Sequence, residues 1–159
     1  METIQITLPD GSTRPVPRGT TPAELARQIS PRLAEEALVA RVQYPDGPPA
    51  EPSPGNSNGD LVDLAQPLEK DARVAILTQK DPAALEVFRH SAAHLLAAAV
   101  LDLFPNVKLG VGPPIEYGFF YEFLRDQPFT PEDLGRIEAK MRELAAQNIP
   151  NERKLLPKA

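Results

Sequence analysis

The sequence predicts an α+β protein made of two successive units, and three observations support this prediction. Residues 4–8 alternate apolar and polar side chains and lead into Asp10-Gly11, which is typical of a β-hairpin. Residues 21–29 carry the start signals of a helix, and short β-rich runs follow. Residues 81–105 form a long alanine-rich segment bounded by prolines, which indicates a second helix and a second unit.

The first expected unit covers residues 1–80 and is a mixed sheet crossed by one helix. Pro15 and Pro17 place the second strand at a sheet edge, because proline has no N–H to donate to a neighbouring strand. Residues 37–42 and 72–78 are β-rich runs that supply further strands. The order strand, strand, helix, strand, strand predicts a compact α+β module.

Both helices begin with residues that cap helices well. Thr21 is the expected N-cap of the first helix, Pro22 suits its first position, and Glu24 completes a capping box. Asp81 is the expected cap of the second helix, with Pro82 in its first turn.

A stretch dense in Pro, Gly, Ser and Asn, residues 44–60, separates the β-rich runs of the first unit. It has no periodicity, so we expect a long, mobile surface loop. The residues behind it have the pattern of the remaining half of the same sheet. The loop is therefore expected inside the first unit rather than at a domain boundary.

The second expected unit, residues 81–159, begins with a helix and a β-hairpin. Proline stops the helix at position 105, and its apolar face, expected to be largely buried, contains Leu85, Phe88, Ala92, Leu95, Ala99 and Leu103. Residues 107–124 are expected to form a strand, a Gly-Pro turn and a strand. Alternation in the second strand places three rings on one side, Phe119, Tyr121 and Phe123.

A final helix is expected to begin at Thr130, with Asp133 at the capping-box position. Its charged residues indicate a solvated face. Its apolar stripe is predicted to consist of Leu134, Ile137, Met141 and Leu144. The last residues, 149–159, end without an evident element.

Composition excludes several classes of protein. The net charge of −5 and the absence of a basic cluster argue against a simple nucleic-acid clamp. Cysteine is absent, which removes disulfides and thiolate sites. The N-terminus has no signal-peptide pattern, and the richest apolar stretch, residues 92–103, is too short to span a bilayer. We expect a soluble cytoplasmic protein without a membrane partner.

The two histidines of the chain, His90 and His94, are four residues apart and therefore share a helix face. Such a pair can chelate a metal, but HSAAH lacks the glutamate of HExxH, and no Cys or third His is present as a further ligand. An acid–base role suits the pair better than a metal site. The spacing is explained equally well if the two histidines have no functional role and are partly buried, with hydrogen bonds to backbone carbonyls.

A glycine-rich hairpin follows the histidine helix. Gly110, Gly112 and Gly118 permit tight turns or a close approach of the backbone to a ligand, and Tyr121 adds a polar group to an aromatic body. The same residues are also explained without a ligand, if the hairpin has an aromatic core. Because sequential elements usually pack together, the hairpin and the helix are expected to meet, which favours a pocket.

Two parts of the chain resemble known domains. The segments ITLPDGS, TTPAEL and LVDLAQPLEKDARVAILT resemble the TGS domain, a β-grasp module of threonyl-tRNA synthetases, certain GTPases and SpoT-type enzymes. LEVFRHSAAHLLAAAVLDLFPNVKLGVGPPIEYGFFYEF resembles the opening of the editing domain of bacterial-type threonyl-tRNA synthetases. The resemblance implies a TGS domain at residues 1–80 and an incomplete threonyl/alanyl-type editing domain at residues 81–159.

The resemblance also implies a function, which is the hydrolysis of serine wrongly attached to threonine tRNA. In that family the residues matching His90 and His94 hold the ester end of the tRNA and the hydrolytic water, and those matching Tyr121 and Gly112 line the pocket. It implies no metal in this pocket. ATP, Mg and a zinc belong to the family's catalytic domain, tRNA is the partner, and the parent enzyme is expected to be a homodimer through domains absent here.

The chain departs from the family pattern in several places. The family's Cys-x-x-x-His element is absent, as are the class II catalytic and anticodon-binding domains, and the 44–60 stretch is unusually long. We therefore expect a fragment that by itself neither aminoacylates nor edits efficiently. Two other classes stay open: a free-standing trans-editing factor and a non-enzymatic TGS-type ligand-binding or RNA-binding module.

Overall fold

The computed structural model describes residues 2–45 and 59–150. Most of the expected 44–60 loop, residues 46–58, and the tail, residues 151–159, lie outside the described residues. The chain divides into two compact units, Met1–Phe88 and Arg89–Ala159. Helices and strands occur in both units, as the predicted α+β class requires.

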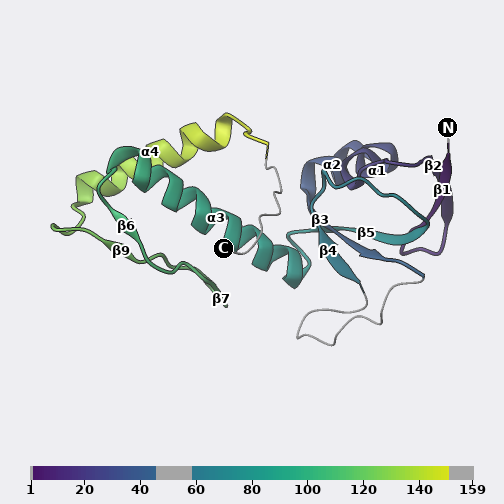
Figure 1. The fold of residues 1–159 in the computed structure, drawn as a ribbon, viewed down its shortest axis with the longest axis horizontal. Helices are drawn as coiled ribbons and strands as arrows, with labels where there is room; N and C mark the ends of the chain where they lie inside the picture. The colour runs from purple at the N-terminus through teal and green to yellow at the C-terminus, as the bar shows by residue number, and fades with distance from the viewer. Residues whose placement is uncertain (1, 46–58, 151–159) are drawn as a thin grey trace, which may run out of the picture. The chain divides into compact units, whose positions relative to one another are not determined.

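A five-stranded mixed sheet forms the first unit, in the order β2-β1-β5-β3-β4 (Figure 1). β1 (Thr3–Thr7) pairs antiparallel with β2 (Thr13–Pro17) and parallel with β5 (Ala72–Thr78). β3 (Ala37–Gln43) pairs antiparallel with β5 and with β4 (Asp60–Val62). The two prolines of β2 therefore lie on an edge strand, as predicted.

The turn between β1 and β2 has the predicted chemistry. The Gly11 N–H donates to the Leu8 carbonyl at 2.9 Å, and the Leu8 N–H donates to the Ser12 carbonyl at 2.8 Å. Gly11 has a φ of +82°, which a residue without a Cβ adopts at little cost. The Asp10-Gly11 signal thus fixes the hairpin register.

Two short helices follow β2. α1 (Pro22–Ile29) begins with the predicted capping box: the Thr21 N–H donates to Glu24 Oε2 at 2.8 Å, and the Glu24 N–H donates to Thr21 Oγ1 at 3.3 Å. α2 (Pro31–Glu36) was not predicted, although Ser30 caps it by accepting the Leu33 N–H at 3.1 Å. β4 was also not predicted, because three residues are too few to show a period.

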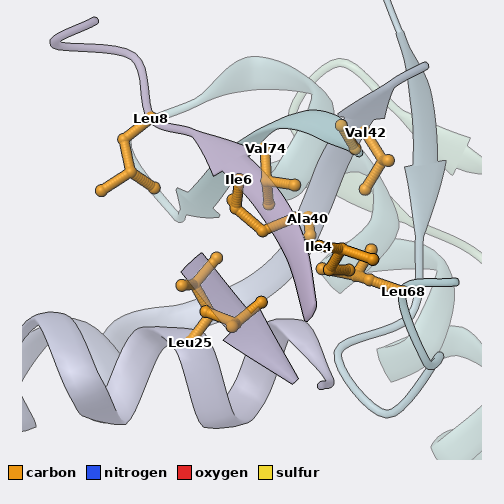
Figure 2. Close-up of a cluster of buried hydrophobic side chains, with 10 residues drawn as sticks. Ile4, Ile6, Leu8, Leu25, Ala40, Val42, Leu68 and Val74 are labelled. Atoms are coloured by element: carbon orange, nitrogen blue, oxygen red, sulfur yellow. The ribbon is translucent and has the colours of Figure 1, made fainter. Parts of the chain in front are cut away.

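The core of the first unit lies between the sheet and α1, as Figure 2 shows. Ile4 and Ile6 of β1 point into this core, while Thr3 and Gln5 are exposed, which confirms the predicted alternation. Leu25 of α1 is fully buried against them. The same cluster contains Leu8, Val16, Ala40, Val42, Leu68, Ala72 and Val74.

α3 (Pro82–Leu103) confirms the predicted helix but not its predicted burial. Phe88 is 53% exposed and Leu101 is 37% exposed. The buried side chains of α3 are Ala84, Ala93, Ala97, Ala99 and Val100. Alanine occupies so much of the circumference that the pattern alone does not define which face is buried; the packing partners do.

α3 also corrects the expectation that no segment is long enough to span a membrane. Its 22 residues are, by length and composition alone, enough to cross a bilayer. Core helices of soluble proteins can be equally long and apolar, so length and composition do not show whether α3 spans a membrane or packs inside a soluble protein.

The first turn of α3 packs with the first unit. Ala84 is fully buried in a cluster with Val39 of β3 and Leu77 of β5. Arg41 Nη2 lies 3.7 Å from Asp81 Oδ1, whose carboxylate also accepts the Ala83 N–H at 2.9 Å. Asp81 therefore caps the helix, as predicted, and its ion pair ties the cap to β3.

The second unit packs α4 (Pro131–Ala146) against α3 (Figure 1). Ala99 and Val100 of α3 and Ile137 of α4 are buried in one cluster, with Met141 and Leu144 packed against it. The predicted stripe is thus correct except for Leu134, which is 59% exposed and is not part of this cluster.

The hairpin of the second unit consists of two short ladders. β6 (Lys108–Leu109) pairs with β9 (Phe123–Leu124), and β7 (Pro114–Ile115) pairs with β8 (Gly118–Phe119). The turn therefore lies at residues 116–117, and the predicted Gly-Pro turn is wrong. The backbone continues extended past Pro113-Pro114 because proline is compatible with an edge strand.

Arg125 joins the hairpin to α4. Its Nη1 donates to Asp133 Oδ2 at 2.9 Å, and its guanidinium lies 4.4 Å from the centroid of the Phe104 ring and 4.9 Å from that of Phe129. Asp133 completes the predicted capping box with Thr130. The guanidinium of Arg125, together with the Thr130 N–H, holds the pKa of the Asp133 carboxyl below its ordinary value.

We expect Asp133→Asn to destabilise the second unit in a pH-dependent way. A carboxyl whose pKa is depressed on folding stabilises the folded state above its unfolded pKa, and this contribution is lost as pH falls through the folded pKa. The variant should therefore unfold at lower urea than the parent near pH 7 and match it near pH 2, measured on NMR signals of α4. Glu132→Gln, an exposed neighbour in the same helical turn, is the control. If the variant were less stable than the parent by the same amount at both pH values, the charge of the Asp133 carboxylate would not be the cause.

Candidate functional site

His90 and His94 form a contacting pair on α3. Their Nε2 atoms are 3.1 Å apart, and the rings stack with centroids 4.7 Å apart and an interplanar angle of 30°. One nitrogen must donate and the other accept, so the bond requires at least one neutral imidazole. Both side chains are exposed, so their free edges are open to a ligand or water.

His94 also lines a cavity of about 630 Å³ within the second unit. The cavity lies between α3 and the C-terminal end of α4, and its other lining residues are Ser91, Leu95, Ala98, Leu144, Ala145, Asn148 and Ile149. This volume is within the range of roughly 300–1,000 Å³ that is usual for small-molecule sites. The second histidine of the pair thus faces a space large enough for a substrate group.

Gly112 and Tyr121 contact each other across the hairpin. A Cβ at Gly112 would overlap the Tyr121 ring at Cδ2 and Cε2 and would lie 2.8 Å from its Cγ. The φ of Gly112 is not in the left-handed region, so the glycine is required by the close approach of the ring and not by its backbone conformation. Tyr121 also stacks on Phe123, with ring centroids 5.0 Å apart.

A β-bulge lies beside this contact. The Gly110 N–H donates to the Glu122 carbonyl at 2.8 Å, while the Glu122 N–H donates to the Val111 carbonyl at 2.9 Å. Gly110 and Val111 thus lie opposite the single residue Glu122, and the register of the pairing changes before Gly112. Phe119, Tyr121 and Phe123 are half-buried, whereas the residues that follow each of them are exposed, which confirms the predicted alternation.

The helix and the hairpin pack together, as predicted. Arg89 Nη1 donates to the Ile115 carbonyl at 3.3 Å, and Phe123 packs against the cluster of Ala99 and Val100. Within the part of the chain that the structure describes, however, no hydrogen bond or ring contact joins the histidines to Tyr121. The four predicted site residues therefore form two pairs rather than one constellation.

Two residues of the cavity were missed from the sequence. Ser91 lies three positions before His94, so helical spacing could have identified it as a neighbour on the same face. Asn148 follows α4 with a φ of +47°, a conformation that asparagine tolerates better than most residues. No pattern in the sequence connected Asn148 with the histidines.

Metal ligands do not gather around the pair in the described residues. Across 2–45 and 59–150, no group of three or more His, Cys, Asp or Glu side chains could hold a metal ion.

Comparison with known proteins finds similarity in both parts of the chain. The TGS domain family matches residues 4–78, which agrees with the expected β-grasp module. Proteins named threonine–tRNA ligase are similar along almost the whole chain: the one from Acidobacterium capsulatum is 49% identical over 98% of it, and that from Pelobacter propionicus is 50% identical over 98%. The ligase from Citrifermentans bemidjiense is 48% identical over 100%.

The chain spans about a quarter of the length of these relatives, namely 25%, 22% and 23%. The similarity includes the histidine helix and the hairpin as well as the first unit, because the TGS match ends at residue 78 and the alignments continue beyond it.

We expect Gly112→Ala to destabilise the hairpin, because its Cβ would displace the Tyr121 ring. Forced packing of this kind costs about 1–3 kcal/mol of unfolding free energy. NMR-monitored urea unfolding of hairpin residues measures the loss, and the same substitution in a Tyr121→Ala background should cost much less. Gly135→Ala is the control: no atom lies within 4 Å of its Cβ position in α4, so it should stabilise the helix by about 1 kcal/mol. Equal costs in both backgrounds would rule out the ring contact as the cause.

Proposed function

We propose that this chain, which carries a TGS domain and belongs with the N-terminal regions of threonine–tRNA ligases, takes part in hydrolysing serine from mischarged threonine tRNA. The observation that carries the proposal is the exposed His90–His94 pair, with Nε2 atoms 3.1 Å apart beside a cavity. Similarity to proteins named threonine–tRNA ligase supports a tRNA substrate, and the pair supplies groups suited to ester hydrolysis.

A separate hydrolysis of Ser-tRNA is needed because serine and threonine are hard to distinguish by binding alone. Serine lacks one methyl group of threonine, and one methylene-sized difference gives a pocket only about 1–3 kcal/mol of discrimination. A second site that hydrolyses the wrong ester corrects this error. The ester is cleaved when water attacks its carbonyl carbon and the bond to the ribose oxygen breaks, which releases serine and free tRNA.

The histidine pair can supply the proton transfers of this reaction. A neutral imidazole accepts a proton from the attacking water, and its hydrogen bond to the second ring fixes its orientation. The resulting imidazolium can return the proton to the departing ribose oxygen. We assign His90 and His94 to this role as catalytic residues, and Tyr121 and Gly112 to the wall of the substrate pocket.

The remaining steps belong to other parts of such a ligase. We propose that threonine activation with ATP and Mg²⁺, the zinc centre and the homodimer contact lie outside this chain, and that the protein works in the cytoplasm with tRNA as its partner. By itself the chain of 159 residues should neither aminoacylate nor edit efficiently. Robust deacylation of Ser-tRNA by the isolated chain would contradict this division.

The test uses the full-length ligase that carries this chain. We expect His90→Ala and His94→Ala each to lower kcat for Ser-tRNA deacylation by roughly 10²–10⁴-fold, the usual contribution of a positioned acid or base. Threonine aminoacylation and the Kd for tRNA in filter binding should not change. Glu86→Ala, exposed on the same helix, is the matched control and should retain full deacylation.

Two outcomes would overturn the proposal. Deacylation that survives both histidine substitutions would remove the catalytic role. A weaker Kd for tRNA with unchanged turnover would instead assign the pair to an RNA-binding module.

A further inference from the structure

A separate cavity lies at the C-terminal end of α3, within the second unit. Its volume is about 500 Å³, inside the range of roughly 300–1,000 Å³ that is usual for small-molecule sites. Residues 103–108 and 124–127 line it, so its walls come from the end of α3, β6, β9 and the residues after β9. None of these residues lines the cavity beside His94. We call this second cavity the β6/β9 pocket.

The inner wall of the β6/β9 pocket is apolar and held in place by contacts within the chain. Val107 is buried, and Leu103 and Phe104 are half-buried. The Val107 N–H donates to the Phe104 carbonyl at 3.0 Å, which fixes the turn after α3. The guanidinium of Arg125 lies 4.4 Å from the centroid of the Phe104 ring and is itself bonded to Asp133. This wall is therefore formed without a ligand and suits an apolar group.

Two side chains of opposite charge line the β6/β9 pocket without pairing with each other. Lys108 and Asp126 are both exposed. Leu124 pairs with Lys108 in the β6–β9 ladder, and Asp126 follows Leu124 by two residues, so both charges lie at the same end of the hairpin. Within residues 2–45 and 59–150, neither side chain forms an ion pair. Both charges are therefore available to a ligand.

This arrangement of charge selects a ligand that carries both signs. A simple anion would be attracted by Lys108 and repelled by Asp126, and a simple cation would meet the reverse. The third charged residue of the pocket, Arg125, is already paired with Asp133. The last carbonyl groups of α3, which carry partial negative charge, add to the attraction for a cationic group near Leu103. An α-amino acid has an ammonium group and a carboxylate on one carbon, and its side chain projects away from both.

We propose that the β6/β9 pocket binds a free α-amino acid with an apolar side chain. Lys108 contacts the carboxylate of the amino acid, Asp126 contacts its ammonium group, and Phe104 and Val107 receive its side chain. This site is independent of the proposed editing function, because it contains neither the histidine pair nor the Gly112–Tyr121 contact. A bound amino acid would join the end of α3 to the hairpin, so the stability of the second unit would rise with the concentration of the free amino acid.

The test compares L-leucine with two analogues that each lack one charge, using the isotope-labelled chain of 159 residues. N-acetyl-L-leucine has no ammonium group, and L-leucinamide has no carboxylate. We expect L-leucine to shift the amide NMR signals of Val107, Lys108 and Asp126, and the titration to give its Kd. Each analogue should bind about fivefold more weakly, because it loses one ionic contact at an exposed site.

Two substitutions assign each charge of the ligand to its partner. Lys108→Gln should weaken L-leucine binding about fivefold and leave the Kd of L-leucinamide unchanged, because this analogue has no carboxylate to lose. Asp126→Asn should weaken L-leucine binding to the same extent and leave the Kd of N-acetyl-L-leucine unchanged. Lys108→Arg keeps the charge and should retain binding. Lys80→Gln and Glu116→Gln, which are exposed outside the pocket, are the matched controls and should bind like the parent.

Each other outcome overturns the inference. If L-leucine shifts no signal of the pocket, the pocket does not bind amino acids. Equal weakening of L-leucine and L-leucinamide by Lys108→Gln, at unchanged Tm, would show that Lys108 does not contact the carboxylate. If acetate alone produced the same shifts at the same concentration, the pocket would be a site for anions and not for a zwitterion. If the full-length ligase did not bind L-leucine although the isolated chain did, another part of the ligase would occupy the pocket.

Discussion

The second unit depends on the packing of Ala99 and Val100 of α3 against Ile137 of α4. Without this contact, α4 would be a single helix with exposed apolar residues, and the short strands of the hairpin would be marginal in water. The cluster also receives Phe104, Phe123 and Phe129, which brings the hairpin to the same core. The histidine pair, the Gly112–Tyr121 contact and the cavity beside His94 all lie on elements that this packing interface brings together.

Arg125 makes that interface specific. Its guanidinium satisfies Asp133 at the start of α4 and lies over the rings of Phe104 and Phe129. Apolar packing alone tolerates rotation of a helix, whereas a half-buried ion pair and two ring contacts allow one arrangement. The rotation of α4 determines which of its residues face α3, and hence which of them line the cavity beside His94.

The sequence predicted the features that depend on local chemistry. Thr21 with Glu24, Thr130 with Asp133, and Asp10-Gly11 each act within a few residues, so their patterns identified caps and a turn correctly. The prediction was wrong where burial depends on packing between distant segments: Phe88 and Leu134 were expected on apolar faces but are exposed. The spacing of His90 and His94 predicted that they share one helix face, but Asn148 is 54 positions from His94 and no local signal links them.

The charge of the chain bears on the proposed tRNA partner. The net charge is −5, and none of the residues that line the cavity beside His94 is a lysine or an arginine, so this cavity does not supply the phosphate contacts that dominate affinity for nucleic acid. If the chain acts on tRNA as we propose, the phosphates of the tRNA are contacted elsewhere, and the similar ligases, which are more than four times longer than this chain, have the length for such contacts.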